Sequence, residues 1–282
     1  MGSIIDGKAY AQKLKDDIKQ FAHKRKSEGF RVPCLATILV GNDGGSIYYV
    51  NNQKKICESL GIENRNIRLE ETITEKQLLE IIEDLNEDAD VDGIILQLPL
   101  PKHIDEKMVT SKISSDKDVD GLTEVNLGRF YKGEKCFIPC TPQSVIHLIK
   151  STGIEIQGKN AVVVGRSNIV GKPAAQLLLN ENATVTICHS KTQNLKEVCS
   201  NADILVCALG KPGFITEEYI KAGAVVIDVG TSMVEGSIKG DVNFSSVLPK
   251  AAYITPVPGG VGAVTTTMLM KNTCEAMKKN VY

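Results

Sequence analysis

The residues best able to do chemistry in this 282-residue chain form a glycine-containing turn. The apolar run Val162–Val164 leads directly into Gly165, and Gly171 follows within the same turn. A glycine after a buried strand permits the tight turn into a helix. A second glycine lets backbone N–H groups at the helix N-terminus approach a pyrophosphate. The spacing is not the usual G-x-G-x-x-G, so a purely structural turn is the alternative. The order strand, turn, helix, strand favours a dinucleotide site.

The end of the next expected strand bears on the choice of dinucleotide. Sites selective for NAD tend to carry an acidic residue there, which binds the ribose 2′-hydroxyl. Here the strand runs into His189-Ser190-Lys191-Thr192, without a carboxylate. Arg166 and Ser167 stand in the first turn and offer a cation and a hydroxyl donor to a 2′-phosphate. The sequence therefore predicts NADP rather than NAD, although Lys191 could also be a solvated loop charge.

Helical and strand patterns alternate along the whole chain, which is typical of parallel sheets covered by helices. The expected helices of the first half cover residues 7–28, 46–60 and 74–88, and the expected strands cover 35–40, 66–69 and 93–98. In the second half, strands are expected over 160–164, 183–188, 204–209, 224–229 and 253–255, and helices over 171–182, 195–201, 217–221 and 265–279. The charged, loop-like stretch 114–142 separates the two series. The sequence predicts an α/β fold with two α/β domains, the second Rossmann-like.

Composition excludes several classes of function. The formal net charge of −1 provides no overall attraction to nucleic acid or to an anionic membrane. The N-terminus lacks a secretory signal pattern, and no apolar run approaches the ~20 residues that span a bilayer. Most of the eight cysteines lie in apolar segments, as expected for buried free thiols. Cys136 and Cys140 lack a second Cys/His pair, so no metal site is expected. We expect a soluble, cytoplasmic protein.

Five segments, taken together and in order, carry a family resemblance. They are Gly45–Val50, Gln97–Pro101, Lys117–Gly121, Gly165–Pro173 and Thr255–Gly262. In this order and spacing they resemble the methylenetetrahydrofolate dehydrogenase/methenyltetrahydrofolate cyclohydrolase family, the FolD type. Each segment alone is weak evidence, whereas five in register are specific, and the resemblance covers essentially the whole chain.

The resemblance implies an architecture and two chemical steps. Residues 1–140 would form a folate-binding catalytic domain, with the last helix, about 265–282, packing back on it. Residues 141–264 would form the Rossmann-like NADP-binding domain, with a cleft between the two and a homodimer formed through the nucleotide domain. A hydride would pass from 5,10-methylenetetrahydrofolate to NADP+, which requires positioning of two rings. Water would then open the methenyl product to 10-formyltetrahydrofolate, which requires proton transfer.

The resemblance also implies roles for individual residues. Tyr49 corresponds to an active-site tyrosine beside the pterin, Gln97 to a hydrogen-bonding glutamine, and Asp120 to the carboxylate that holds two parallel pterin N–H groups. The implied substrate-binding set is Ser46, Tyr49, Gln97, Leu98, Pro99, Asp120, Pro258, Gly259 and Gly260. The implied cofactor-binding set is Thr141, Gly165, Arg166, Ser167, Ile169, Val170, Gly171, His189, Ser190, Lys191, Thr192 and Thr231.

Each of these assignments has a structural alternative. A tyrosine on a helix is more often part of the core or the surface than catalytic. Asp118 and Asp120 could simply stabilise a turn with Gly121. Gln97 could be a strand-end amide with its hydrogen bonds satisfied. The joint match of the five segments favours the functional roles.

The sequence departs from the family at one catalytic position. Bifunctional members carry Tyr-x-x-x-Lys, whereas here Tyr49 is followed four residues later by Gln53. The two lie on one helix face, while Lys54 is turned about 100° away. Glutamine cannot carry a proton and has no charge to lower the pKa of a neighbour. We therefore include Gln53 among the catalytic positions and predict a dehydrogenase whose cyclohydrolase step is weak or absent.

Three other functions are open at this point. The first is the fully bifunctional enzyme, in which Tyr49, Gln97 and ordered water manage protons without the lysine. The second is an NADP dehydrogenase for another substrate, such as a shikimate-type hydroxy acid, against which Asp120 and the segment 258–260 argue. The third is a regulatory protein that binds NADP without turnover.

Overall fold

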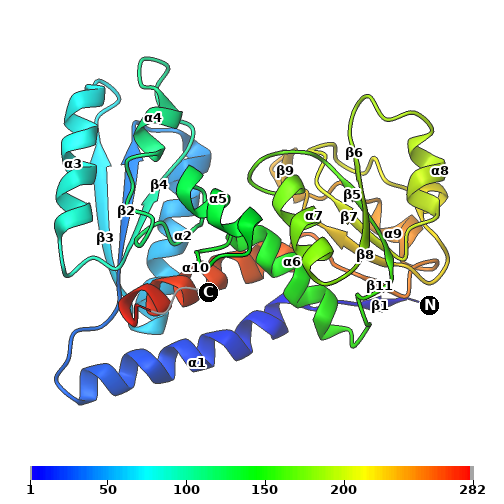
Figure 1. Cartoon of the computed structure of the whole chain (residues 1–282), viewed down its shortest axis with the longest axis horizontal. Helices are drawn as coiled ribbons and strands as arrows, with labels where there is room; N and C mark the ends of the chain where they lie inside the picture. The colour runs from blue at the N-terminus through cyan, green and yellow to red at the C-terminus, as the bar shows by residue number, and fades with distance from the viewer. Residues whose placement is uncertain (1, 280–282) are drawn as a thin grey trace. The chain divides into compact units, whose positions relative to one another are not determined.

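The computed structural model describes residues 2–279, which divide into two compact units (Figure 1). Residues 2–13 and 139–265 form one, which we call the six-stranded unit; residues 14–138 and 266–279 form the other, the three-stranded unit. Two helices, α1 (Gly7–Ser27) and α10 (Val261–Met277), contribute residues to both units. Within the described residues, no helix is long and apolar enough to cross a membrane.

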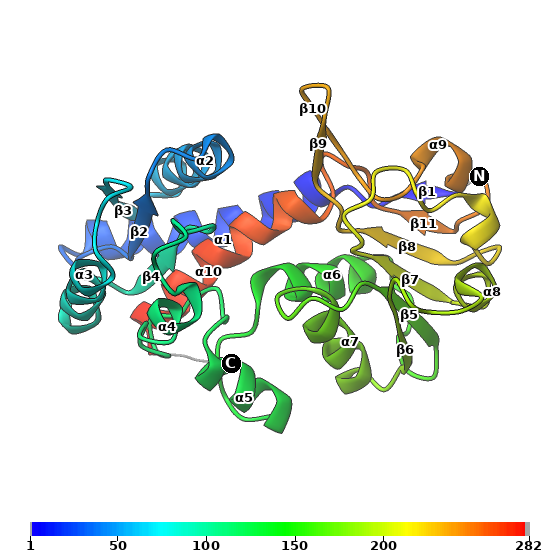
Figure 2. The ribbon, with the colours of Figure 1, turned by 90° about the horizontal axis from the view of Figure 1, so that it is seen from above.

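The six-stranded unit is built on a parallel sheet in the order β1-β11-β8-β7-β5-β6 (Figure 2). Its strands are β1 (Ser3–Ile4), β5 (Asn160–Val164), β6 (Thr184–Cys188), β7 (Ile204–Cys207), β8 (Val225–Asp228) and β11 (Tyr253–Ile254). The central strands β7 and β8 are buried throughout, as in parallel sheets covered on both faces. The chain leaves β5 for β6 on one side and then crosses to β7 on the other. Ligands bind at such a switch point, outside the carboxyl ends of the strands.

Short helices and one hairpin complete this unit. The helices are α6 (Cys140–Ser151), α7 (Gly171–Asn180), α8 (Leu195–Ser200), α9 (Phe244–Val247) and a 3₁₀ helix over Glu217–Tyr219. An antiparallel hairpin joins β9 (Ser232–Val234) to β10 (Ser237–Lys239). Helices α6 and α7 pack against one another, and α6 also contacts β8. The core between sheet and helices includes Val162, Leu205 and Val226, all buried.

The three-stranded unit has a small parallel sheet in the order β3-β2-β4. Its strands are β2 (Cys34–Val40), β3 (Glu63–Leu69) and β4 (Gly93–Leu96), and β2 is buried along its whole length. The helices that lie within this unit are α2 (Gly44–Leu60), α3 (Glu75–Glu87), α4 (Glu106–Thr110) and α5 (Glu124–Lys132). A second apolar core, which includes Ile38, Leu78 and Ile82, joins the sheet to α3.

The observed elements confirm the predicted α/β class and the parallel Rossmann-like sheet in the second half of the chain. Gly61 ends α2 in the left-handed conformation, and Thr74 caps α3 with Gln77 in a reciprocal capping box. The prediction of loops over 114–142 was wrong in part, since α5 lies inside that stretch and α6 begins there. The helix expected over 217–221 is a single 3₁₀ turn. The last helix begins at Val261 rather than at 265, and positions 280–282 of its expected range lie outside the described residues.

Candidate active site

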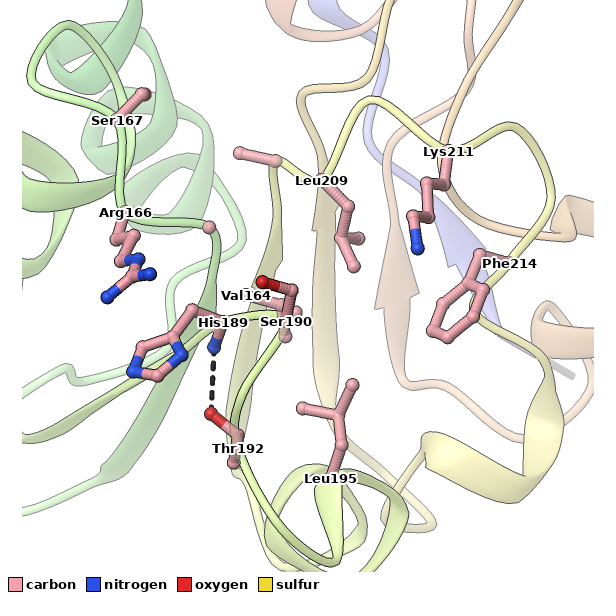
Figure 3. A pocket seen from close by; sticks show the side chains of 12 residues that line it. Val164, Arg166, Ser167, His189, Ser190, Thr192, Leu195, Leu209, Lys211 and Phe214 are labelled. Atoms are coloured by element: carbon pink, nitrogen blue, oxygen red, sulfur yellow. Dashed lines mark hydrogen bonds between the residues drawn. The ribbon is translucent and has the colours of Figure 1, made fainter.

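A cavity of about 430 Å³ lies at the switch point of the six-stranded sheet (Figure 3). Its walls come from the loops after β5, β6 and β7. The lining residues are Val164, Gly165, Arg166, Ser167, His189, Ser190, Thr192, Leu195, Ala208, Leu209, Lys211 and Phe214. The structure therefore brings together six of the residues that were expected to bind the cofactor, from two loops that are separate in sequence.

The turn after β5 has no room for a side chain at two of its positions, Gly165 and Gly171. Gly165 has φ +137°, and a β-carbon on it would overlap the carbonyl oxygen of Ala208. A β-carbon on Gly171 would likewise overlap the carbonyl oxygen of Gly165. The Ser167 hydroxyl oxygen accepts the N–H groups of Val170 (3.2 Å) and Gly171 (3.3 Å). Gly171 was expected to open backbone N–H groups to a pyrophosphate. Its own N–H is taken by Ser167, so in this structure the glycine serves the close packing of the turn.

The cavity is cationic on two opposite sides. Arg166 and His189 lie on one side and Lys211 on the other (Figure 3). The His189 backbone N–H donates to Thr192 Oγ1 at 2.8 Å, and the Lys191 N–H donates to His189 Nδ1 at 3.1 Å. In the neutral ring, this second bond leaves the proton on Nε2. No described lining residue is a carboxylate. Such a wall suits a ligand rich in phosphate.

Six lining residues of this cavity were missed from the sequence: Val164, Leu195, Ala208, Leu209, Lys211 and Phe214. The strand expected over 204–209 ends at Cys207, so Leu209 and Lys211 belong to the loop that follows it. The signal was present, because the loops after neighbouring parallel strands reach the same edge of a sheet. A glycine-rich loop after the third strand of the series therefore had to border the cavity.

A second cavity of about 200 Å³ shares Ser167 and Ala208 with the first. Its other lining residues are Val170, Gly210, Val229, Gly230, Thr231, Ser232 and Asp241. The two cavities together follow the ends of β6, β5, β7 and β8, and their shape suits an elongated two-part ligand. Among the described residues that were expected to bind the cofactor, four lie outside the walls of both cavities: Thr141, Ile169, Gly171 and Lys191.

In the three-stranded unit, the expected substrate residues lie where β2 and β4 end. Asp43 caps α2 by accepting the Ser46 N–H at 2.8 Å, and this bond lowers the pKa of the Asp43 carboxyl. The buried Ser46 hydroxyl lies 2.9 Å from Asp43 Oδ2 and 3.2 Å from the carbonyl oxygen of Leu98. The Gln97 N–H donates to the carbonyl oxygen of Ile38 at 2.9 Å. The Ser46–Leu98 contact ties the start of α2 to the segment after β4, and the Gln97–Ile38 bond ties that segment to β2.

Tyr49 and Gln53 lie one turn apart on α2. Tyr49 is half exposed, whereas Gln53 is buried. The Thr37 hydroxyl accepts from Asn64 Nδ2 at 3.1 Å and donates to Gln53 Oε1 at 3.5 Å. These two hydrogen bonds orient the side-chain carbonyl of Gln53 toward β2, so its N–H₂ group faces the opposite side. Lys54, as expected, points elsewhere: it is exposed and lies 3.9 Å from Glu58.

The segment around Asp120 is held by its neighbours. The buried Asp118 carboxylate accepts the N–H groups of Leu122 (3.1 Å) and Thr123 (2.8 Å) and the side-chain amide of Asn126 (2.8 Å). Burial raises the pKa of this carboxyl. Asn272 of α10 donates to the carbonyl oxygen of Val119 at 2.8 Å. The turn is thus stabilised by Asp118, while Asp120 is half-buried between these fixed points.

The expected substrate loop Pro258-Gly259-Gly260 belongs to the six-stranded unit. A β-carbon on Gly260 would lie 2.5 Å from the carbonyl oxygen of Pro256, and one on Gly7 would overlap Gly260 itself. The loop therefore packs tightly on the start of α1. Pro258 is exposed at its tip.

Comparison with protein families decides the class of protein. Residues 5–120 match the tetrahydrofolate dehydrogenase/cyclohydrolase catalytic domain, and residues 139–281 match the NAD(P)-binding domain of the same family. The chain belongs to the tetrahydrofolate dehydrogenase/cyclohydrolase family. The expected family, the enzyme class and a nicotinamide cofactor are confirmed at this level.

Individual family members are similar over the full length. The bifunctional protein FolD of Clostridium acetobutylicum is 64% identical over 278 residues, which cover 99% of this chain and 100% of that protein. The crystal structure of the bifunctional FolD of Campylobacter jejuni superimposes with a TM-score of 0.96 at 43% identity, covering 99% of each chain. The Trypanosoma brucei FolD, solved with NADP and an inhibitor, gives a TM-score of 0.93 at 40% identity, covering 99% of this chain and 98% of that one.

Proposed function

We propose that this chain oxidises 5,10-methylenetetrahydrofolate to 5,10-methenyltetrahydrofolate with NADP+, as a step of one-carbon metabolism. The observation that carries the proposal is the cationic cavity at the switch point, in a chain of this family. Its described walls hold Arg166, His189 and Lys211 and no carboxylate, which fits a 2′-phosphate better than a free 2′-hydroxyl. The Trypanosoma brucei relative with bound NADP supports the same cofactor.

The residues present fit this cofactor, and we assign them as follows. Arg166, Ser190 and the His189 Nε2–H would hold the adenosine phosphate, and Thr231 would border the second half of the molecule. NADP+, when bound, supplies the hydride acceptor. The protein then needs only to bind and orient two rings, and precise positioning alone can supply several kcal/mol of a barrier, roughly 7–11 in the best cases.

On the folate side, the assignments rest on the positions carried by the sequence. We propose that Asp120 accepts two N–H groups of the pterin, that Tyr49 lies beside it, and that Gln97 hydrogen-bonds in the same network. Ser46 would act by holding the segment Leu98-Pro99, since its hydroxyl contacts the Leu98 carbonyl. Pro258, Gly259 and Gly260 complete the proposed substrate contacts.

We further propose that the cyclohydrolase step is weak or absent. Gln53 stands one turn from Tyr49, and its carbonyl is engaged by Thr37. The carboxamide can donate a hydrogen bond but cannot carry a proton. Lys54, exposed and beside Glu58, is not placed to substitute for a lysine at position 53. Loss of acid–base assistance lowers a rate by about 10²–10⁴-fold.

The second candidate is the fully bifunctional enzyme, which forms 10-formyltetrahydrofolate as well. The comparison with relatives favours this candidate, because a protein that is 64% identical over nearly the whole chain is called bifunctional. In this case Tyr49, Gln97 and ordered water would move the protons.

One assay tests both candidates. Purified protein receives methylenetetrahydrofolate and NADP+, and the absorbances of NADPH and of the methenyl product are followed together. We expect both to rise in parallel, with the methenyl product then decaying no faster than in buffer. Enzyme-dependent decay of the methenyl product would establish the second candidate instead. NADP binding without NADPH formation would contradict both.

The variant Gln53→Lys provides the matched test of the missing proton carrier. We expect it to raise enzyme-dependent methenyl hydrolysis at least tenfold while NADPH formation changes less than threefold, because hydride transfer needs no protein proton carrier. Lys54→Gln is the control, and it should leave both rates unchanged. An equal loss of both activities in Gln53→Lys would show that the glutamine is needed for folding or binding rather than for this difference.

We also propose a homodimer in the cytoplasm. In the described sheet, β6 is an edge strand, and its Ile187 is 40% exposed; Leu179 of α7 is also exposed. An apolar edge of this kind is normally covered. All eight cysteines are free and buried, as in proteins of reducing compartments. Sedimentation velocity should give the mass of a dimer, and Ile187→Lys should shift it to the monomer.

A further inference from the structure

Two buried aspartates adjoin these cavities: Asp241, which lines the second one, and Asp228, which accepts the Asp241 N–H. Neither is more than 3% exposed. The Asp241 carboxylate accepts three consecutive backbone N–H groups of the loop after β7: those of Leu209 (2.6 Å), Gly210 (3.0 Å) and Lys211 (2.7 Å). A single side chain thus fixes the main chain of this loop at three points.

Asp228, at the end of β8, fixes Asp241 in turn. Its Oδ1 accepts the N–H groups of Gly230 (2.9 Å) and Asp241 (3.0 Å), and its Oδ2 accepts that of Val242 (3.0 Å). The Asp228 N–H donates to Thr255 Oγ1 at 2.8 Å. Two glycines make the room: a β-carbon on Gly230 would collide with the Asp241 carboxyl, and one on Gly240 with that of Asp228.

This arrangement is costly for the fold alone. Two neighbouring buried carboxylates lose hydration and repel each other, and packed apolar side chains would hold the strands together at lower cost. Each carboxylate instead receives three N–H donors. The three bonds to Asp241 fix the backbone of residues 209–211. This backbone conformation places Lys211 on the cavity wall.

The loop after β7 positions the Lys211 side chain at the cavity. Its Nζ lies 5.4 Å from the centroid of the Phe214 ring, and the ammonium stands on the side of the cavity opposite Arg166 (Figure 3). In the described wall it is the cation contributed by the loop after β7.

We propose that Lys211 binds a phosphate of the cofactor and that Asp241 is the positioning residue that holds Lys211 in place to do so. This inference rests on the proposed NADP function and adds a second cationic contact to it. The phosphate is either the adenosine 2′-phosphate or the 5′-phosphate of the same nucleotide half.

The test is titration calorimetry of the full chain with adenosine 2′,5′-bisphosphate and with 5′-AMP. Lys211→Met should weaken the bisphosphate about tenfold to a hundredfold, the range for a lost charge-assisted hydrogen bond. Lys211→Arg should retain most of the binding. A loss for the bisphosphate alone assigns Lys211 to the 2′-phosphate, whereas an equal loss for both assigns it to the 5′-phosphate. Unchanged binding by Lys211→Met overturns the proposal.

A double-mutant cycle tests the role of Asp241. In the unaltered chain, Asp241→Asn should weaken binding of the bisphosphate about as much as Lys211→Met does. In the Lys211→Met background, Asp241→Asn should weaken that binding by less than a further twofold. Equal fold-losses in both backgrounds would mean that Asp241 only maintains the fold. If Asp241→Asn does not fold, Gly210→Ala takes its place, because it strains the same loop at φ +68° while both buried carboxylates stay in the chain. The same coupling is expected, and its absence overturns the positioning role.

Two controls separate this inference from its premises. Lys196→Met removes a lysine that also lies over an aromatic ring, that of Tyr219, but pairs with Glu218 and is not among the lining residues. Asp203→Asn removes a carboxylate that accepts a backbone N–H, from Asn160, outside both cavities. Both variants should bind like the unaltered chain. If the unaltered chain itself does not bind the bisphosphate, the NADP proposal fails, whatever the variants do.

Discussion

Gly165 illustrates how one residue can determine the shape of a cavity. Its φ of +137° and its contact with the Ala208 carbonyl both exclude a β-carbon, so two separate constraints meet at one position. This glycine was predictable, because it directly follows a buried strand. The role of Gly171 was not, because its neighbour is the carbonyl of Gly165, and that contact exists only once the turn has closed.

We predict that Gly165→Ala is far more damaging than an ordinary glycine substitution. Left-handed or strained backbone costs about 1–3 kcal/mol, and the overlap with Ala208 adds to it. Cofactor affinity should fall at least tenfold and the melting temperature should drop, as measured by calorimetry and thermal unfolding. Gly158→Ala is the matched control, since Gly158 also has positive φ (+72°) but nothing lies within 4 Å of the place a β-carbon would occupy. Similar effects at the two positions would contradict the packing argument.

At the residue scale, Lys211 marks the limit of prediction from sequence. Arg166, His189 and Ser190 follow strands recognisable by their apolar runs, and they line the same cavity. Lys211 lies in a glycine- and proline-containing loop, where a lysine is usually solvated. Its position depends on three N–H bonds to Asp241, thirty residues further along the chain. No local pattern reports such a contact.

At the scale of elements, burial explains why α3 was predicted and α6 was missed. The amphipathic α3 was predicted to within one residue because its buried positions recur with helical period. In α6, by contrast, most residues are buried on every side, so the alternation that identifies a helix is absent. The structure shows that Asp118 stabilises the turn 117–121. Residue types alone had allowed this role for both Asp118 and Asp120, and the resemblance assigned the pterin to Asp120.

Asp118 offers a prediction about this turn. Asp118→Ala would leave two backbone N–H groups and one of the two N–H groups of the Asn126 amide without their acceptor, at a cost of about 1–3 kcal/mol for each group that finds no water. We expect a clear loss of stability and a several-fold rise in KM for methylenetetrahydrofolate, because Asp120 loses its support.

The control for this prediction lies in the cofactor. The KM for NADP+ should stay within twofold in Asp118→Ala, since the residues that we propose to bind the cofactor belong to the other unit. Parallel increases in both KM values would indicate general loss of folded protein rather than a local effect on Asp120.

At the scale of the whole molecule, Asp228 predicts an unusual pH dependence of stability. Burial raises the pKa of this carboxyl to about 6, above its ordinary value of 3.8. The folded chain therefore binds more protons than the unfolded chain between these values, so this group's contribution falls as pH rises from about 4 to 6. Two pKa units correspond to roughly 3 kcal/mol.

Urea unfolding at a series of pH values checks this. The free energy of unfolding of the unaltered chain, minus that of Asp228→Asn, should fall by roughly 2–3 kcal/mol between pH 4 and 6 and stay level above 7. Asp203 provides the contrast, because its hydrogen bond to Lys221 lowers the pKa of that carboxyl. The corresponding difference for Asp203→Asn should rise with pH in the acid range. A flat curve for Asp228 would contradict its burial as a carboxylate.

The edge strand β1 has a consequence for how this chain can be made and divided. Ser3 pairs with Tyr253 and Ile4 with Ile254, so a segment that leaves the ribosome early completes a sheet with a strand that leaves it much later. The strand β1 cannot pair with the sheet until β11 has been translated. Cutting the gene between residues 138 and 139 would therefore not release two independent proteins, because the second piece would lack its outermost strand and the first would carry that strand away.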